Sequence, residues 1–180
     1  MIEQLIGPQL LTPLAQRITD NVFKLCDDVK NEIKQNLRDD IYAYIGNIVN
    51  KYSKIKTFLH SEEQRNFYDV YFPLSLLYNR EILNMPDNPD KLFVKSNFVT
   101  LLGHAGCGKT MILKHVFLSA CKKSSKIPLV VELRKLKGYE GNFSDYVSDN
   151  VIKFRLSQNK SIYERMLKKG QFLFLLDGYD

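Results

Sequence analysis

The sequence predicts an α/β protein in which an all-helical N-terminal region is followed by a parallel sheet with flanking helices. Three observations predict this class. Apolar residues recur every three or four positions over residues 14–52, as on one buried helical stripe. Short apolar runs alternate with helical patterns over residues 98–176, which is the order of elements in a parallel sheet covered by helices. A segment with two prolines, residues 84–90, separates the two patterns.

The N-terminal stripe indicates a small helical bundle or a helix pair docked on the rest of the chain. Asp39 and Asp40 can cap a new helix start, so the stripe fits either one helix or two. A coiled coil is the weaker alternative, because regular flanking charge pairs are missing. The residues of the stripe are Leu14, Ile18, Val22, Leu25, Val29, Ile33, Leu37, Ile41, Tyr44, Ile48 and Tyr52.

The region after the stripe sets the domain boundary. We expect another helix over residues 61–69, where Ser-Glu-Glu-Gln can form a cap. Residues 71–74 should be extended, since the residue before a proline avoids the helical conformation. We divide the chain into a helical domain over residues 1–83, a linker or extended segment over residues 84–96, and a second domain over residues 97–180.

The second domain alternates strands and helices. Runs of aromatic and β-branched residues predict strands, and apolar residues at helical spacing predict helices. The expected elements are a strand over Phe98–Leu102, a helix over Met111–Cys121, a strand over Pro128–Leu133, a helix over Phe143–Phe154, a short helix over Ser161–Gly170 and a strand over Phe172–Leu176.

Composition excludes several classes of protein. No apolar run is longer than that of residues 172–176, far below the roughly 20 residues of a membrane span. No basic segment precedes an apolar one at the N-terminus, so no secretory signal is expected. The cysteines, Cys26, Cys107 and Cys121, form no Cys-x-x-Cys pair, which indicates reduced thiols, a cytoplasmic setting and no zinc site.

The charge differs between the two halves of the chain. Residues 1–90 carry 10 basic and 13 acidic side chains, a net charge of −3, and residues 91–180 carry 16 and 7, a net charge of +9. The basic half can attract nucleic acid, a membrane surface or a polyphosphate ligand. A solvated face is the simplest interpretation of its basic cluster and a nucleic-acid or acidic-partner patch is the alternative; the cluster comprises Lys114, Lys122, Lys123, Lys126, Arg134, Lys135 and Lys137.

The segment between the first expected strand and its helix fits the pattern G-x-x-x-x-G-K-[ST] without substitution. Its glycines allow successive N–H groups to point into one concavity at a helix N-terminus, which suits the β-phosphate of a nucleotide. Lys109 can reach the β- and γ-phosphates, and the Thr110 hydroxyl can ligate Mg²⁺. The candidate nucleotide-binding residues are Gly103, His104, Ala105, Gly106, Cys107, Gly108, Lys109, Thr110 and Met111. Contacts to the base are expected from residues 71–96.

Two acidic residues follow the last expected strand. Asp177 comes directly after its apolar run, so it should lie at the carboxyl end of the sheet and hold Mg²⁺ together with Thr110, directly or through water. Asp180 is a candidate to orient or polarise the attacking water. A turn-forming Asp-Gly pair is the alternative interpretation of Asp177.

Three segments together resemble the NACHT NTPases: the phosphate loop of residues 103–110, the strand PLVVELR of residues 128–134, and FLLDGYD of residues 174–180. A weaker resemblance covers residues 54–59 and 67–74, which are similar to the helical region that precedes bacterial NACHT domains. The family includes inflammasome receptors and bacterial anti-phage defence proteins. The resemblance implies a cytoplasmic ATP/ADP switch with Mg²⁺ and slow ATP hydrolysis, which self-associates on activation.

The family continues beyond the point that corresponds to Asp180 with a sensor strand and further helical and ligand-sensing regions. The resemblance therefore implies the N-terminal part of a larger receptor, whose unknown activating ligand binds a C-terminal region, and an incomplete P-loop NTPase over residues 97–180. We expect residues 1–180 alone to bind nucleotide poorly and to hydrolyse almost none.

Two other functions remain open from the sequence. The N-terminal helices can form an interaction or effector module that the nucleotide fold only regulates. A GTPase is a distant third interpretation. It is disfavoured because no Asn-Lys-x-Asp string, which reads guanine, occurs.

Overall fold

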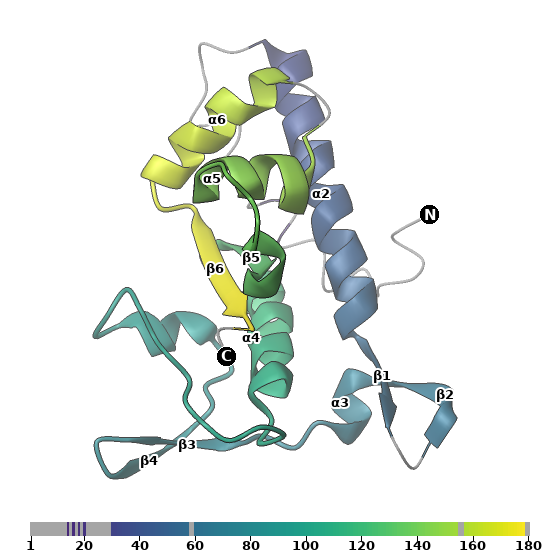
Figure 1. The fold of residues 1–180 in the computed structure, drawn as a ribbon, viewed down its shortest axis with the longest axis vertical. Coiled ribbons are helices and arrows are strands. Elements are labelled where there is room, and N and C mark those ends of the chain that lie inside the picture. The colour runs from purple at the N-terminus through teal and green to yellow at the C-terminus, as the bar shows by residue number, and fades with distance from the viewer. Residues whose placement is uncertain are drawn as a thin grey trace.

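The computed structural model describes residues 14, 16, 18, 20, 30–57, 60–154 and 157–178 (Figure 1). Its helices and strands, in chain order, are α2 (Asn31–Tyr52), β1 (Lys54–Thr57), β2 (His60–Asn66), α3 (Phe67–Val70), β3 (Ser75–Tyr78), β4 (Glu81–Asn84), the 3-10 helix η1 (Pro89–Phe93), α4 (Lys109–Lys123), β5 (Ile127–Glu132), the 3-10 helix η2 (Leu133–Leu136), α5 (Phe143–Tyr146), the π-helical turn η3 (Val147–Ile152), α6 (Ser157–Lys168) and β6 (Phe172–Asp177).

The centre of the fold is the parallel pair β5–β6, which confirms the predicted α/β class with a parallel sheet and flanking helices. The register runs from Ile127 opposite Phe172 to Glu132 opposite Asp177. Parallel strands need a long crossover, which here comprises η2, α5, η3 and α6. β5 is buried over five of its six residues, as expected for a strand covered on both faces.

Helix α2 continues the apolar stripe without a break (Figure 1). The alternative of a new helix start at Asp39–Asp40 is therefore wrong, because both residues lie inside α2. Asp40 is buried and accepts a hydrogen bond of 2.9 Å from the Asn159 amide of α6 instead of capping a helix. The rest of the N-terminal stripe lies mostly outside the described residues.

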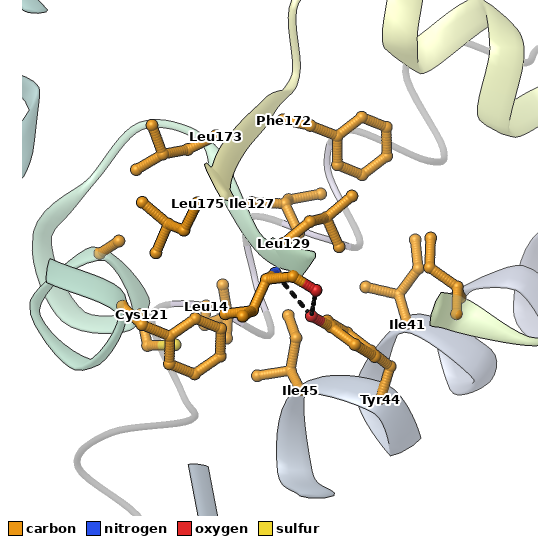
Figure 2. Packing of buried hydrophobic residues seen from close by; sticks show 14 of the residues in the cluster. Leu14, Ile41, Tyr44, Ile45, Cys121, Ile127, Leu129, Phe172, Leu173 and Leu175 are labelled. Carbon is orange, nitrogen blue, oxygen red and sulfur yellow. Dashed lines mark hydrogen bonds between the residues drawn. The ribbon is translucent and has the colours of Figure 1, made fainter. Parts of the chain in front are cut away.

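The outer edge of β5 is closed by one side chain of α2, Tyr44 (Figure 2). The Val130 N–H donates to the Tyr44 hydroxyl oxygen over 2.7 Å, and the hydroxyl donates to the Val130 carbonyl over 3.3 Å. The N–H and C=O of one strand residue point to the same side of the strand. Tyr44 thus satisfies both groups of Val130 on the edge that faces away from β6, and burial raises the pKa of its phenol.

The expected helix over residues 61–69 is wrong for most of its length, because β2 pairs with β1 in an antiparallel hairpin and only Phe67–Val70 are helical. Residues 61–66 contain no apolar side chain that a helix could bury. A second hairpin joins β3 to β4, with Asn79 and Arg80 at positive φ in its turn. The helical N-terminal region therefore also contains two hairpins. The predicted break in the helical pattern at residues 71–74 is confirmed, with Tyr71 in an extended conformation.

The expected strand Phe98–Leu102 is also wrong. These residues have no regular structure, and Phe98 and Leu102 are 87% and 90% exposed. A strand forms only where its N–H and C=O groups find a neighbouring strand. Among the described residues β6 pairs on the side of β5 alone, and Tyr44 occupies the other edge of β5.

The remaining elements of the second domain are confirmed, with shifts at their ends. α4 is two residues longer than predicted at each end, β6 is one residue longer at its C-terminal end, and β5 is shifted by one residue toward the N-terminus. The segment 143–154 divides into α5 and η3. α6 begins at Ser157, four residues before the predicted cap, and ends before Gly170, whose φ is +66°. None of the helices in the described ranges combines the length and apolar character that crossing a membrane requires. The division of the chain at residues 84–96 stays a prediction.

The Tyr44 hydroxyl should contribute measurably to stability. In Tyr44→Phe the ring stays, but the buried N–H and C=O of Val130 lose their partner, which costs about 1–3 kcal/mol. Urea unfolding followed by circular dichroism measures the loss. Tyr78→Phe, at a half-exposed ring on β3, is the matched control and should change stability little. Equal stability of the two variants would contradict the role given to Tyr44.

Candidate functional site

The predicted phosphate loop leads directly into α4. Gly108 is the N-cap of this helix with φ +95°, and Gly106 has φ +76°. Both conformations are in the left-handed region that favours glycine, which explains two of the three glycines of the motif. No side chain caps the helix, so the N–H groups of its first turn remain available for an anion.

Lys109 folds over the loop that precedes it. Its Nζ donates to the carbonyl oxygens of Gly103 at 2.7 Å and His104 at 3.1 Å. The ammonium therefore lies against the loop backbone instead of extending into solvent. A phosphate group bound in the loop would also attract the Lys109 ammonium. The lysine of the motif therefore already lies at the predicted phosphate site.

Two side chains lie close to glycines of the loop. A Cβ added to Gly103 would lie 2.5 Å from Cys107 Sγ, and one added to Gly108 would lie 2.6 Å from Leu74 Cδ1. Leu74 belongs to the extended segment 71–74, so the chain upstream of the loop contacts it directly. The motif alone did not identify Leu74 as a neighbour of the loop. Leu74 does belong to residues 71–96, the segment from which contacts to the base were expected.

Asp177 ends β6 directly opposite Glu132, the last residue of β5. Burial, together with the negative charges of Asp177 and Glu132, raises the pKa of Tyr52 to about 12. Burial lowers the pKa of Lys114 in α4, Lys51 lowers it further, and Asp177 opposes the shift. Asp177 thus lies at the carboxyl end of the sheet, as predicted, within the electrostatic field of α2 and α4.

Glu132 pairs with two lysines at the carboxyl end of the sheet. Its carboxylate forms ion pairs with Lys135 at 2.9 Å and with Lys51 at 3.4 Å. The hydrogen bond from Lys135 is the main cause that lowers the pKa of Glu132. Sequence reasoning missed this carboxylate, because only its register with Asp177 in the folded sheet brings it to the site.

The predicted basic cluster is largely engaged in specific contacts. Lys123 forms an ion pair with Asp87 at 3.0 Å, and Lys135 pairs with Glu132. Lys114 and Lys122 lie over the rings of Tyr52 and Tyr68, at 5.7 and 5.4 Å from their centroids. A solvated and locally paired face explains these residues, and the nucleic-acid interpretation gains no support from them.

The structure brings together only part of the predicted site. It joins Lys109 to Gly103 and His104. His104, Ala105, Cys107 and Thr110 are exposed, and Met111 is half-buried against the core. In the residues that the structure describes, no hydrogen bond joins Thr110 to Asp177, and Asp180 lies outside them.

The residues present fit a nucleotide and its Mg²⁺. The uncapped start of α4, the loop glycines and the inward Lys109 provide donors for phosphate oxygens. The described residues hold no group of three His, Cys, Asp or Glu side chains suited to a metal. A hydroxyl and one carboxylate, as in Thr110 and Asp177, are the sparse protein ligands that Mg²⁺ uses when phosphates complete its shell.

Tyr52 makes the stability of the fold depend on pH in the alkaline range. Its pKa is about 12 in the fold and near 10 in an unfolded chain. The folded state holds the proton more tightly, so this contribution to stability is complete below about pH 10 and is lost as the pH rises to about 12. Urea unfolding from pH 9 to pH 12 should show the fall, and Tyr52→Phe should make it shallower. An unchanged slope in the variant would contradict the assignment.

Comparison with known proteins gives one family. Residues 97–180 match the family model of the NACHT domain. No curated protein matches the chain significantly, and neither does any solved structure. The match covers the phosphate loop, α4, the β5–β6 pair and Asp177, which are the features described above. The match therefore supports a NACHT domain, a nucleotide-binding NTPase fold, over residues 97–180.

Proposed function

We propose that the chain is the ATP/ADP-binding switch of a NACHT signalling protein. The observation that carries this proposal is the phosphate loop: glycines at positive φ, an uncapped helix N-terminus, and Lys109 already bonded to the loop carbonyls. This set of donors suits a polyphosphate, and the family match supports nucleotide as the ligand.

Each residue of the site has a proposed part in binding. The N–H groups at the start of α4 bind the β-phosphate, and Lys109 moves from the loop carbonyls to the β- and γ-phosphates. Thr110 and Asp177 hold Mg²⁺, which when bound spreads the charge of the phosphates. Asp180 orients the attacking water, and hydrolysis is slow.

The nucleotide state would reach the N-terminal region through α2. Tyr44 ties this helix to β5, Lys51 ties it to Glu132, and Tyr52 lies near Asp177. A change of charge at Asp177 is therefore felt by side chains of α2. We propose that this coupling controls self-association and effector output in a cytoplasmic signalling or anti-phage receptor, whose activating ligand is unidentified. Neither Cys107 nor Cys121 forms a disulfide bond in the described part of the chain, which supports the cytoplasmic setting.

Lys109→Ala should weaken ATP binding at least tenfold, about 1.4 kcal/mol or more, because the loop backbone has no charge that replaces the ammonium. Titration of a fluorescent ATP analogue, followed by anisotropy, measures the affinity. Lys168→Ala removes an exposed lysine from the end of α6 and serves as the control. Thermal shifts with ATP, ADP and GTP on the unchanged protein test the choice of nucleotide.

An ATP affinity that Lys109→Ala leaves unchanged would contradict the proposed function. Equal responses to ATP, ADP and GTP, seen only at millimolar concentration, would also contradict an ATP/ADP switch. A larger thermal shift with ATP and ADP than with GTP, lost in Lys109→Ala, is the expected result.

Asp177→Asn should remove most of the effect of Mg²⁺ on ATP binding, since the amide keeps the size of the side chain but loses the negative charge that a divalent cation needs. The measurement is ATP affinity with Mg²⁺ and with EDTA. Asp149→Asn, at an exposed position of η3, is the matched control. If Mg²⁺ strengthens ATP binding equally in both variants, Asp177 does not hold the cation.

A further inference from the structure

Arg134 lies close to Gly178, the residue that follows Asp177. It belongs to η2, the 3-10 helix that begins where β5 ends. A Cβ added to Gly178 would lie 3.4 Å from Arg134 Nε, 3.7 Å from Nη2 and 4.0 Å from Cζ. Gly178 has φ +78°. Glycine suits this left-handed backbone conformation, and the guanidinium lies within ordinary van der Waals reach of the position.

Two lysines near Arg134 have a carboxylate partner, whereas its own guanidinium has none among the described residues. Lys51 and Lys135 both pair with Glu132, which ends β5 two residues before Arg134. In the described part of the chain the Arg134 guanidinium forms no hydrogen bond or ion pair, and the residue is exposed. Its planar set of N–H donors therefore remains available to a ligand at the carboxyl end of the sheet, where Asp177 lies.

A ligand is expected at this carboxyl end of the sheet. In open α/β sheets, ligands bind outside the carboxyl ends of the strands, and both Glu132 and Asp177 are the last residues of their strands. A guanidinium binds phosphate through two parallel hydrogen bonds and keeps its charge at every physiological pH. An arginine supplied within the same chain is a known way to stabilise the terminal phosphate of a nucleoside triphosphate.

We propose that Arg134 binds the terminal phosphate of a nucleoside triphosphate and thereby lets the protein distinguish ATP from ADP. The proposal rests on the proposed function and adds a residue outside the phosphate loop to it. Contact with the γ-phosphate would draw the guanidinium away from Gly178 and so change the packing next to Asp177 at the end of β6. Arg134 is then both the group that detects the third phosphate and the one that transmits its presence to the sheet edge.

The test compares the affinities for ATP and ADP in Arg134→Ala. We expect the affinity for ATP to fall about tenfold or more and the affinity for ADP to stay the same. Arg134→Lys keeps the charge but loses the paired hydrogen bonds, so it should recover only part of the ATP affinity. Lys137→Ala removes an equal charge from the same exposed connection and should bind both nucleotides normally.

The outcomes separate this inference from the proposed function. If Arg134→Ala leaves the ratio of ATP to ADP affinity unchanged while Lys109→Ala weakens both, Arg134 does not detect the third phosphate and the nucleotide switch stands. If Lys137→Ala lowers ATP affinity as much as Arg134→Ala does, general charge explains the effect and the inference is overturned. If Lys109→Ala changes neither affinity, the proposed function itself is wrong.

Discussion

The pair of hydrogen bonds between the Tyr44 hydroxyl and Val130 is the interaction on which the rest of the structure depends. A buried strand edge with free N–H and C=O groups is unstable, and here one phenol satisfies both groups of the central residue of β5. The bonds also fix α2 along the sheet (Figure 2). With α2 in this position, Lys51 reaches Glu132 and Tyr52 comes under the field of Asp177. The N-terminal helix is thus part of the site's electrostatics.

The two halves of the site have separate supports. Lys109 and the loop glycines depend on the start of α4 and on the contact with Leu74. Asp177 depends on β6, on its register with Glu132 and on the neighbouring Gly178, close to which Arg134 lies. β6 packs against α4, so one helix is shared by both halves. A nucleotide that bridges the loop and the carboxyl end of the sheet would join two supports that share this helix.

The sequence predicted the parts of the fold that local pattern determines. β5, β6 and α4 have apolar runs or helical spacing that match their burial, and the phosphate loop is readable because glycine conformation and lysine charge are properties of the residues themselves. The failures have a different cause. Strand formation at Phe98–Leu102 requires a neighbour, and β2 formed because β1 offered one where a helix at residues 61–66 had nothing to bury. Glu132 and Arg134 join Asp177 only through the register of the folded sheet.

Because Tyr44 closes the outer edge of β5, the sheet has a direction of growth. Any further strand can add only beside β6, on the side where its backbone groups meet no partner among the described residues. Each strand that joins there lengthens the row of carboxyl ends that begins with Glu132 and Asp177. A single hydroxyl on a helix outside the matched NACHT segment therefore determines on which flank of Asp177 the sheet can accept another strand.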